Sequence, residues 1–358
     1  MIFLCFFVIN FWQLNFSNLI ISWYKDNKRN LPWRETANPY LIWLSEIILQ
    51  QTRVEQGLPY YIKFSSIYPS IEMMANENEE QILKHWQGLG YYSRARNMHA
   101  TAKHVAFNLA GKFPSTFKEI KQLKGVGDYT AAAIASFSFN EKRAVVDGNV
   151  YRVLSRYFGI HTPIDSSKGK KEFSDLANSL ISKKQPGEFN QGIMEFGALM
   201  CKPKKPLCEN CCFIESCHAF NKNEIQLLPI KSKKLKQRKR YFNFLVITDG
   251  ETILMEQREK KDIWEKLYQF PLIETNKELD EIPKQSTINL NGYEIMDVRA
   301  YKHLLSHQVI YAKFWLLKAN KINLSNNNFN HVKLNQLENF PVPKLVENYL
   351  DEFFQLIN

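Results

Sequence analysis

Apolar residues recur at helical spacing from residue 17 to about residue 220. Proline and glycine interrupt the pattern at intervals, so that it reads as a series of helices joined by turns. Ser17 stands just before the first apolar stripe and is a residue type that caps helix N-termini, so we expect folded structure to begin there. No alternating run competes with this pattern. It predicts an all-α first domain over residues 17–225.

After residue 240 the period of the apolar residues changes to two, as in strands. The alternating runs are residues 241–247, 252–258 and 309–317. A turn signal, Asp249-Gly250, separates the first two runs, and a helical pattern returns near Pro343. The second domain, residues 241–358, is therefore expected to be α+β.

Two segments lie outside these domains. Residues 1–16 are mostly apolar, but no Lys or Arg precedes the run and it is shorter than the ~20 residues that span a bilayer. We expect an N-terminal appendage or a misassigned start codon, and no membrane contact. Residues 226–240 form a basic linker, with seven Lys and Arg residues and no acid between Pro229 and Arg240.

Composition narrows the class of protein. The 358 residues are 45% hydrophobic and 23% charged, which is ordinary for globular domains and excludes a disordered or collagen-like chain. Lys and Arg number 47 against 36 Asp and Glu, a net charge of +11. This excess favours a polyanionic partner, although charge alone does not separate nucleic acid from a membrane surface.

Four cysteines have the spacing C-x6-C-x2-C-x5-C, namely Cys201, Cys208, Cys211 and Cys217. Six cysteines in all are too few for a disulfide scaffold of this length, so a metal centre in a reducing compartment is the better interpretation. A structural zinc site usually presents two C-x2-C pairs, and only one is present here. The compact loop fits a [4Fe-4S] cluster better. Cys212 is then a spare thiol.

One acidic residue stands on an apolar helical face. The segment NPYLIWLSEIILQQT begins with Asn38 as a helix N-cap and Pro39 at the first helical position, and its only acid is Glu46. Burial would raise the pKa of Glu46, so that it could hold and deliver a proton near neutral pH. The alternative is a structural Glu whose side chain reaches Arg34 or Arg53.

The segment LKGVGDYTAAAIASFSF places Gly125 and Gly127 between two helical runs. Such a turn presents backbone N–H groups at a helix N-terminus, where a phosphate can bind, although a plain helix-helix turn has the same pattern. Further on, Asp147 lies between an apolar run and a helix in AVVDGNVYRVLSR. Taken alone, Asp147 is a helix N-cap.

These segments together resemble one family. They are LPWR, WLSEIILQQT, GLGYYSRARN, LKGVGDYTAAAI, VVDGNVYRVLSR, FNQGIMEFGALMC and the four-cysteine loop. In this order they resemble the adenine DNA glycosylases, the MutY branch of the helix-hairpin-helix, endonuclease III-like superfamily. The resemblance implies an all-α helix-hairpin-helix domain with an iron-sulfur loop. It also implies a C-terminal α+β domain of the MutT-like (Nudix) type. The tail lacks the Nudix hydrolase motif, so we expect no pyrophosphatase activity.

The resemblance implies base excision repair of adenine mispaired with 8-oxoguanine, and with guanine, in double-stranded DNA. Glu46 matches the acid that protonates the departing adenine, and Asp147 matches the carboxylate that stabilises the sugar cation. Tyr129 matches the position that hydrogen-bonds this carboxylate and the sugar intermediate. Lyase-type relatives have a Schiff-base lysine where this chain has Tyr129, so a monofunctional glycosylase is expected.

Further positions match DNA-contacting residues of the family. Gln51 and Tyr91 match wedge residues beside the mispair, and Arg34 matches a residue near the adenine pocket. Gly125 and Gly127 form the DNA-binding hairpin. In the tail, Ser306 and His307 match the segment that reads 8-oxoguanine, although Leu305 replaces the usual Phe. A monomer in the bacterial cytoplasm, associated with the nucleoid, is expected.

Two other hypotheses compete with this one. An endonuclease III-like glycosylase and lyase acting on oxidised pyrimidines would share the scaffold and the cysteines, but Tyr129 and the long tail oppose it. A non-catalytic DNA-binding module would have lost Glu46 or Asp147, and both are present.

Overall fold

The computed structural model describes residues 2–232, 237–259, 261–282, 293–318 and 329–357, without the side chains of residues 2–14 and 355–357. Part of the predicted linker, residues 233–236, lies outside the described residues. The chain forms two compact units, one of residues 1–75 and 100–234 and one of residues 76–99 and 235–358. This division differs from the predicted domains because a helical segment of the first domain groups with the tail. The domain boundaries drawn from the sequence stay predictions.

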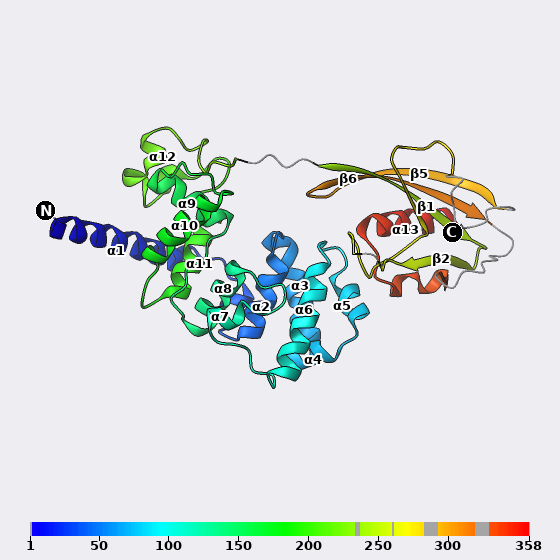
Figure 1. Ribbon diagram of the computed structural model, residues 1–358, viewed down its shortest axis with the longest axis horizontal. Coiled ribbons are helices and arrows are strands. Elements are labelled where there is room, and N and C mark those ends of the chain that lie inside the picture. The colour runs from blue at the N-terminus through cyan, green and yellow to red at the C-terminus, as the bar shows by residue number, and fades with distance from the viewer. Residues whose placement is uncertain (1, 233–236, 260, 283–292, 319–328, 358) are drawn as a thin grey trace. The chain divides into compact units, whose positions relative to one another are not determined.

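The first unit is helical (Figure 1). The helices from the N-terminus to the cysteine loop, including those that residues 76–99 contribute to the second unit, are α1 (Ile2–Asn27), α2 (Pro39–Leu49), α3 (Val54–Ile67), α4 (Ile71–Asn76), α5 (Glu79–Trp86), α6 (Ser93–Lys103), α7 (Phe117–Ile120), α8 (Asp128–Phe139), α9 (Gly148–Phe158), α10 (Ser167–Leu180), α11 (Pro186–Leu199) and α12 (His218–Asn221). Short 3-10 helices lie at Pro32–Arg34, Cys208–Asn210 and Ile214–Ser216, and a π-helical turn at His104–Asn108. Among the described residues before Arg238 there is no strand, as predicted.

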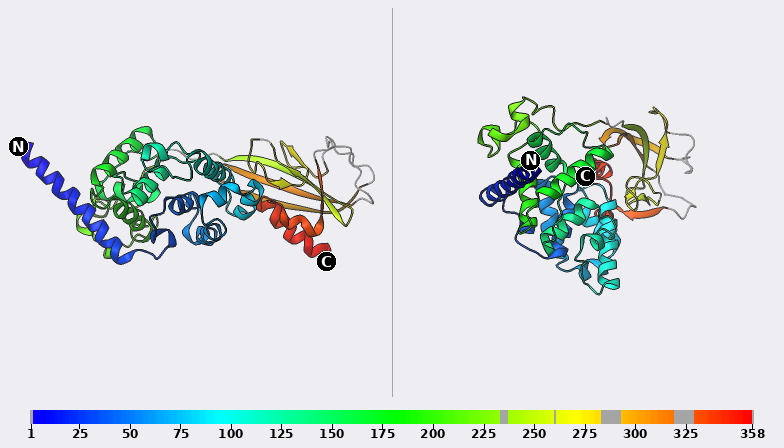
Figure 2. Two further views of the ribbon diagram at one scale, coloured as in Figure 1. Left: turned by 90° about the horizontal axis from the view of Figure 1, so that it is seen from below. Right: turned by 60° about the vertical axis from the view of Figure 1, so that its left-hand side comes forward.

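Helix α1 is longer than the sequence pattern suggested. It runs without a break from Ile2 to Asn27, so Ser17 lies inside it, buried, and the predicted N-cap at Ser17 is wrong. Residues 2–16 contain no proline or glycine, and nothing in them stops a helix. The N-terminal part of α1 projects away from the other helices of its unit (Figure 2).

Close helix packing places the catalytic candidates. Apolar residues of α1, α8, α9, α10 and α11 form one core. Where α11 meets α9, a Cβ added to Gly197 would lie only 2.6 Å from the Asn149 Cβ, so glycine is needed for this approach. Among the described helices, none is long and apolar enough to cross a membrane.

The second unit contains a mixed sheet covered by a helix (Figure 1). Its elements are β1 (Arg238–Thr248), β2 (Thr252–Gln257), β3 (Tyr268–Gln269), β4 (Leu272–Thr275), β5 (Glu294–Leu304), β6 (Gln308–Lys318), β7 (Asn330–Lys333), a 3-10 turn at Leu334–Asn339, and α13 (Lys344–Ile357). The strand order is β3-β2-β1-β6-β5, with β4 paired to β1 and β7 to β2. The three predicted strands, the turn at Asp249-Gly250 and the final helix are confirmed. Strand β5 was missed because it is an edge strand with mostly exposed side chains, which carry little hydrophobic alternation.

Two apolar clusters stabilise the tail. On one face of the sheet, Phe242, Phe314 and neighbours pack against α13, where Phe314 stacks on Tyr349 with ring centroids 4.3 Å apart. A smaller cluster covers part of the other face. Polar contacts attach the helical segment 76–99 to the tail. Gln87 donates to Glu347 over 2.8 Å, and Arg96 pairs with Glu265 over 2.7 Å.

Candidate active site

A cavity of about 500 Å³ in the first unit brings together residues that are far apart in the sequence. Its lining includes Glu46 from α2, Tyr129 from α8 and Asp147 from the start of α9, together with Arg34 and Gln51. These are five of the residues singled out from the sequence. Such a concave site with converging polar groups is a typical place for catalysis.

Glu46 is buried on the apolar face of α2, with 8% of its surface exposed. Asn38 caps this helix by accepting from the Tyr40 N–H over 2.9 Å, as predicted. Burial is the main reason that the pKa of Glu46 rises from 4.5 to about 7. The charge of Asp147 adds to this, whereas a hydrogen bond from Tyr129 and the charge of Arg34 oppose it. Near neutral pH a carboxyl with this pKa is present in both its protonated and its ionised form.

Asp147 is the N-cap of α9, as its sequence position suggested. One carboxylate oxygen accepts from the N–H groups of Asn149 and Val150, over 2.9 and 2.8 Å, and the other accepts from the Asn149 side chain over 2.8 Å. Burial raises the pKa of Asp147, while these hydrogen bonds and Arg152 act in the opposite direction. The cap thus also holds a carboxylate in a fixed orientation at the cavity.

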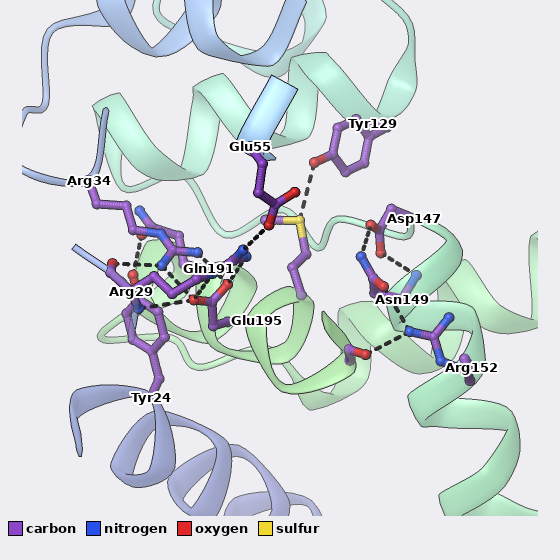
Figure 3. Close-up of polar contacts among 12 residues, drawn as sticks. Tyr24, Arg29, Arg34, Glu55, Tyr129, Asp147, Asn149, Arg152, Gln191 and Glu195 are labelled. Carbon is purple, nitrogen blue, oxygen red and sulfur yellow. Dashed lines mark hydrogen bonds and ion pairs between the residues drawn. The ribbon is translucent and has the colours of Figure 1, made fainter. Parts of the chain in front are cut away.

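Tyr129 follows the glycine hairpin and points into the same cavity (Figure 3). Its hydroxyl is hydrogen-bonded to Glu46 and lies 3.1 Å from the Met194 sulfur. The charge of Asp147 helps to raise the pKa of Tyr129, whereas the hydrogen bonds that Asp147 accepts come from Asn149 and Val150. Burial raises the Tyr129 pKa well above 10, so the phenol stays neutral.

The structure adds an ion cluster that sequence reasoning missed (Figure 3). Glu195 of α11 is 1% exposed and accepts from Arg29 over 2.8 Å and from Arg34 over 2.7 Å. Burial alone would raise the Glu195 pKa, but the hydrogen bonds and charges of both arginines lower it to about 2. Arg34 therefore forms its ion pair with Glu195, and it acts on Glu46 through charge. The sequence feature that could have indicated this cluster is Glu195 itself, an acid within the apolar segment FNQGIMEFGALMC.

A second missed feature connects the cavity to the cysteine loop. Asn149 holds Asp147 with its amide nitrogen and accepts from Arg152 with its oxygen, over 2.8 Å. Arg152 also donates to the Cys201 carbonyl over 2.7 Å. The only sequence signal was an Arg and an Asn on the helix that follows Asp147.

The four cysteines lie around one small apolar cavity that is also lined by Arg156, Pro206 and Leu207. Backbone and side-chain donors face two of the sulfurs. Arg156 approaches the Cys201 sulfur at 3.5 Å, and the Phe213 N–H approaches Cys211 at 3.4 Å. Within the described residues, no three metal-binding side chains are close enough to share a single ion. Four cysteine thiols around one cavity are a donor set that a [4Fe-4S] cluster takes. Cys212 is exposed and does not line the cavity.

The remaining predicted DNA contacts lie on exposed turns. Gln51 and Tyr91 are exposed and have left-handed backbone conformations, with φ of 56° and 49°. Gly125 and Gly127 are exposed, and Gly125 has a φ of +79°. Within the second unit, the Tyr91 hydroxyl contacts the Ser306 hydroxyl. Ser306 and His307 form the exposed turn between β5 and β6.

The fold and the known proteins that this chain is similar to place it in the class of helix-hairpin-helix DNA glycosylases. Residues 44–179 match the HhH-GPD superfamily of base excision DNA repair proteins, and residues 243–352 match a NUDIX domain. A thermostable thymine-DNA glycosylase is 32% identical with a TM-score of 0.56, over 60% of this chain and 99% of that one. An endonuclease III–DNA covalent intermediate, 21% identical with a TM-score of 0.51 over 58% of this chain and 94% of that one, supports the fold alone.

The curated relatives define the branch. The adenine DNA glycosylase of Buchnera aphidicola subsp. Baizongia pistaciae is 37% identical over 88% of this chain and 89% of its own length. That of Homo sapiens is 39% identical over 60% of this chain and 41% of its own length. The chain therefore belongs to the adenine DNA glycosylase family and is a base excision DNA repair enzyme.

Proposed function

We propose that this enzyme removes adenine paired with 8-oxoguanine, and more slowly with guanine, by flipping the adenine into the cavity at Glu46. The observation that carries the proposal is one cavity lined by a buried acid with a pKa near 7 and by an oriented second carboxylate. An acid and an anion with different environments are what cleavage of a glycosidic bond requires.

Glu46 supplies the proton. As the bond from C1′ to adenine N9 breaks, its electron pair moves into the purine, and protonation at N7 makes adenine a better leaving group. A carboxyl with a pKa near the working pH combines a sizeable protonated fraction with the ability to transfer that proton. Ionised Glu46 is then left beside the departing base.

Asp147 stabilises the cationic sugar, or bonds to C1′ until water replaces it. Its orientation is fixed by Asn149 and the start of α9, so it needs no rearrangement when the charge develops. Tyr129 is a phenol rather than an amine, and cannot form a Schiff base with the opened sugar. The proposed reaction therefore ends at an abasic site, without strand cleavage.

The exposed turns would hold the DNA. The N–H groups of the hairpin at Gly125 and Gly127 suit a phosphate, while Gln51 and Tyr91 would fill the space that the flipped base leaves. Ser306 and His307, exposed on the β5–β6 turn, would read 8-oxoguanine. We expect the enzyme to act as a monomer on bacterial chromosomal DNA.

The four-cysteine cavity would hold a [4Fe-4S] cluster through Cys201, Cys208, Cys211 and Cys217. When bound, the cluster would cross-link separate parts of the loop and so stabilise its fold. The loop carries Lys202, Lys204 and Lys205, and the cluster would hold these lysines where they can contact DNA phosphates.

Single-turnover rates on a panel of duplexes test the proposal. Strands with adenine opposite 8-oxoguanine, and more slowly opposite guanine, should become alkali-labile. Duplexes with thymine glycol opposite adenine and with G:T should give no product, and G:T matters because a thymine-DNA glycosylase shares the fold. Cutting of the thymine glycol strand would support the endonuclease III-like alternative.

A further inference from the structure

The turn that carries Tyr91 lies between α5 and α6 and is unusually constrained. Gly88 and Gly90 have φ of 95° and 73°, and Tyr91 itself has a φ of 49°. Glycine adopts this left-handed region freely, but a bulky aromatic residue does so only when surrounding contacts hold it there. Tyr91 exposes 44% of its surface, and the contact of its hydroxyl with Ser306 holds the end of the ring rather than the backbone of the turn.

Two of the contacts that hold the turn come from the side chain of Arg94, three residues after Tyr91. Its guanidinium donates to the carbonyls of Leu89 and Gly90, over 3.3 and 3.1 Å. The Gly90 carbonyl also accepts from the Trp86 ring nitrogen over 3.0 Å. Because both carbonyls belong to the turn, Arg94 fixes the backbone immediately before Tyr91.

The same guanidinium lies close to two aromatic rings. Its central carbon is 5.0 Å from the centre of the Trp86 ring and 5.8 Å from that of Tyr91. Trp86 is fully buried, so it forms a rigid base for the stack. Arg94 thus connects the wedge ring, the turn backbone and the core of the helical segment.

Arg94 is also a charge with only 8% of its surface exposed. Burial lowers its pKa to about 10, and it remains charged at neutral pH. A buried charge is unfavourable unless its contacts compensate for the lost water. If residue 94 only had to form part of the helix, an apolar residue would be sufficient there.

We propose that Arg94 is a positioning residue that holds Tyr91 in its wedge conformation before DNA binds. This inference rests on the proposed wedge role of Tyr91. Pre-organisation of this kind speeds the insertion of the ring, because the turn already has the required backbone conformation when the enzyme meets the DNA.

Stopped-flow fluorescence of 2-aminopurine placed beside 8-oxoguanine tests this inference. The opposite nucleotide is 2′-fluoro-2′-deoxyadenosine, which resists cleavage, so that only unstacking is observed. The full-length Tyr91→Ala variant should lose the fluorescence rise. Arg94→Met should slow it about tenfold, and Arg94→Lys about as much, because an ammonium group cannot span two carbonyls and stack on two rings.

Two further variants distinguish a positioning role of Arg94 from a general loss of structure. Arg96→Met removes a guanidinium from the same helix and should leave the unstacking rate within about twofold of wild type. In Arg94→Met/Tyr91→Ala, the Kd for the uncleavable duplex should match that of Tyr91→Ala alone, because Arg94 acts through Tyr91. If Arg94→Met destabilises the fold, Arg94→Lys, which keeps the charge, provides the test.

The outcomes distinguish the two proposals. An unchanged signal in Tyr91→Ala would show that the proposed wedge role is wrong. A lost signal in Tyr91→Ala would overturn the positioning role of Arg94 alone if it is combined with wild-type unstacking in both Arg94 variants. The same holds if the double variant binds the uncleavable duplex more weakly than Tyr91→Ala does.

Discussion

Replacing Glu46 with Gln separates its chemistry from its effect on stability. The amide keeps the shape of the side chain and removes the transferable proton. Loss of a general acid lowers rates by about 10²- to 10⁴-fold, so we expect single-turnover adenine release to fall by that amount while DNA binding is retained. In the wild type, release should fall as pH rises through about 7, because the protonated form is then lost.

The same pKa predicts a change in stability. A carboxyl whose pKa rises from 4.5 to about 7 on folding favours the folded state when it is protonated. That contribution is complete below pH 4.5 and is lost as pH rises to about 7, and its full size is about 3 kcal/mol. Relative to wild type, Glu46→Gln should therefore gain up to about 3 kcal/mol of unfolding free energy between pH 4.5 and pH 8.

Urea unfolding of both proteins at several pH values measures this gain. Asp175→Asn, an exposed change on α10, is the matched control and should show little of it. Two results would refute the reasoning: a Glu46→Gln enzyme within tenfold of the wild-type rate, or a stability difference that does not change with pH.

Other substitutions test the neighbouring groups. Asp147→Asn should bind duplex DNA and release adenine at least 10²-fold more slowly in single-turnover assays, and near-normal turnover would remove its assigned role. Borohydride should trap wild-type enzyme on DNA weakly or not at all, and Tyr129→Lys is expected to gain trapping; strong wild-type trapping would instead indicate a lyase. Replacing both Ser306 and His307 with Ala should reduce the preference for 8-oxoguanine:A over G:A by roughly 5- to 150-fold in paired rate measurements, and an unchanged preference would place recognition elsewhere. Purified protein should contain about four irons and four labile sulfides per chain by chemical analysis, whereas one zinc without sulfide would contradict the cluster.

Local signals in the sequence were sufficient for much of the fold. The helical period, the N-caps at Asn38 and Asp147 and the turn at Asp249-Gly250 all appear where expected. Each of these depends on a few adjacent residues. The predicted N-cap at Ser17 was wrong because it also rested on adjacent residues alone. A residue type that caps helices does not start a new helix when the residues before it are helical too.

The same distinction between local and long-range contacts applies to the candidate site. The burial of Glu46 could be predicted because its own helix supplies the apolar neighbours. The pairing of Glu195 with Arg29 and Arg34 joins segments about 160 residues apart, so no local pattern contains it. Likewise, the contacts of Arg94 depend on the path of a turn that its sequence only marks with glycines.

Analysis of the small-molecule product tests the central claim most directly. Wild-type enzyme is incubated with an 8-oxoguanine:A duplex, and the released base is identified by chromatography and mass spectrometry. We predict one free adenine for each alkali-labile site, no strand break before alkali, and almost no adenine from Glu46→Gln under the same conditions. Release of a different base, strand cleavage without alkali, or equal release by Glu46→Gln would contradict the assignment of adenine excision to this cavity.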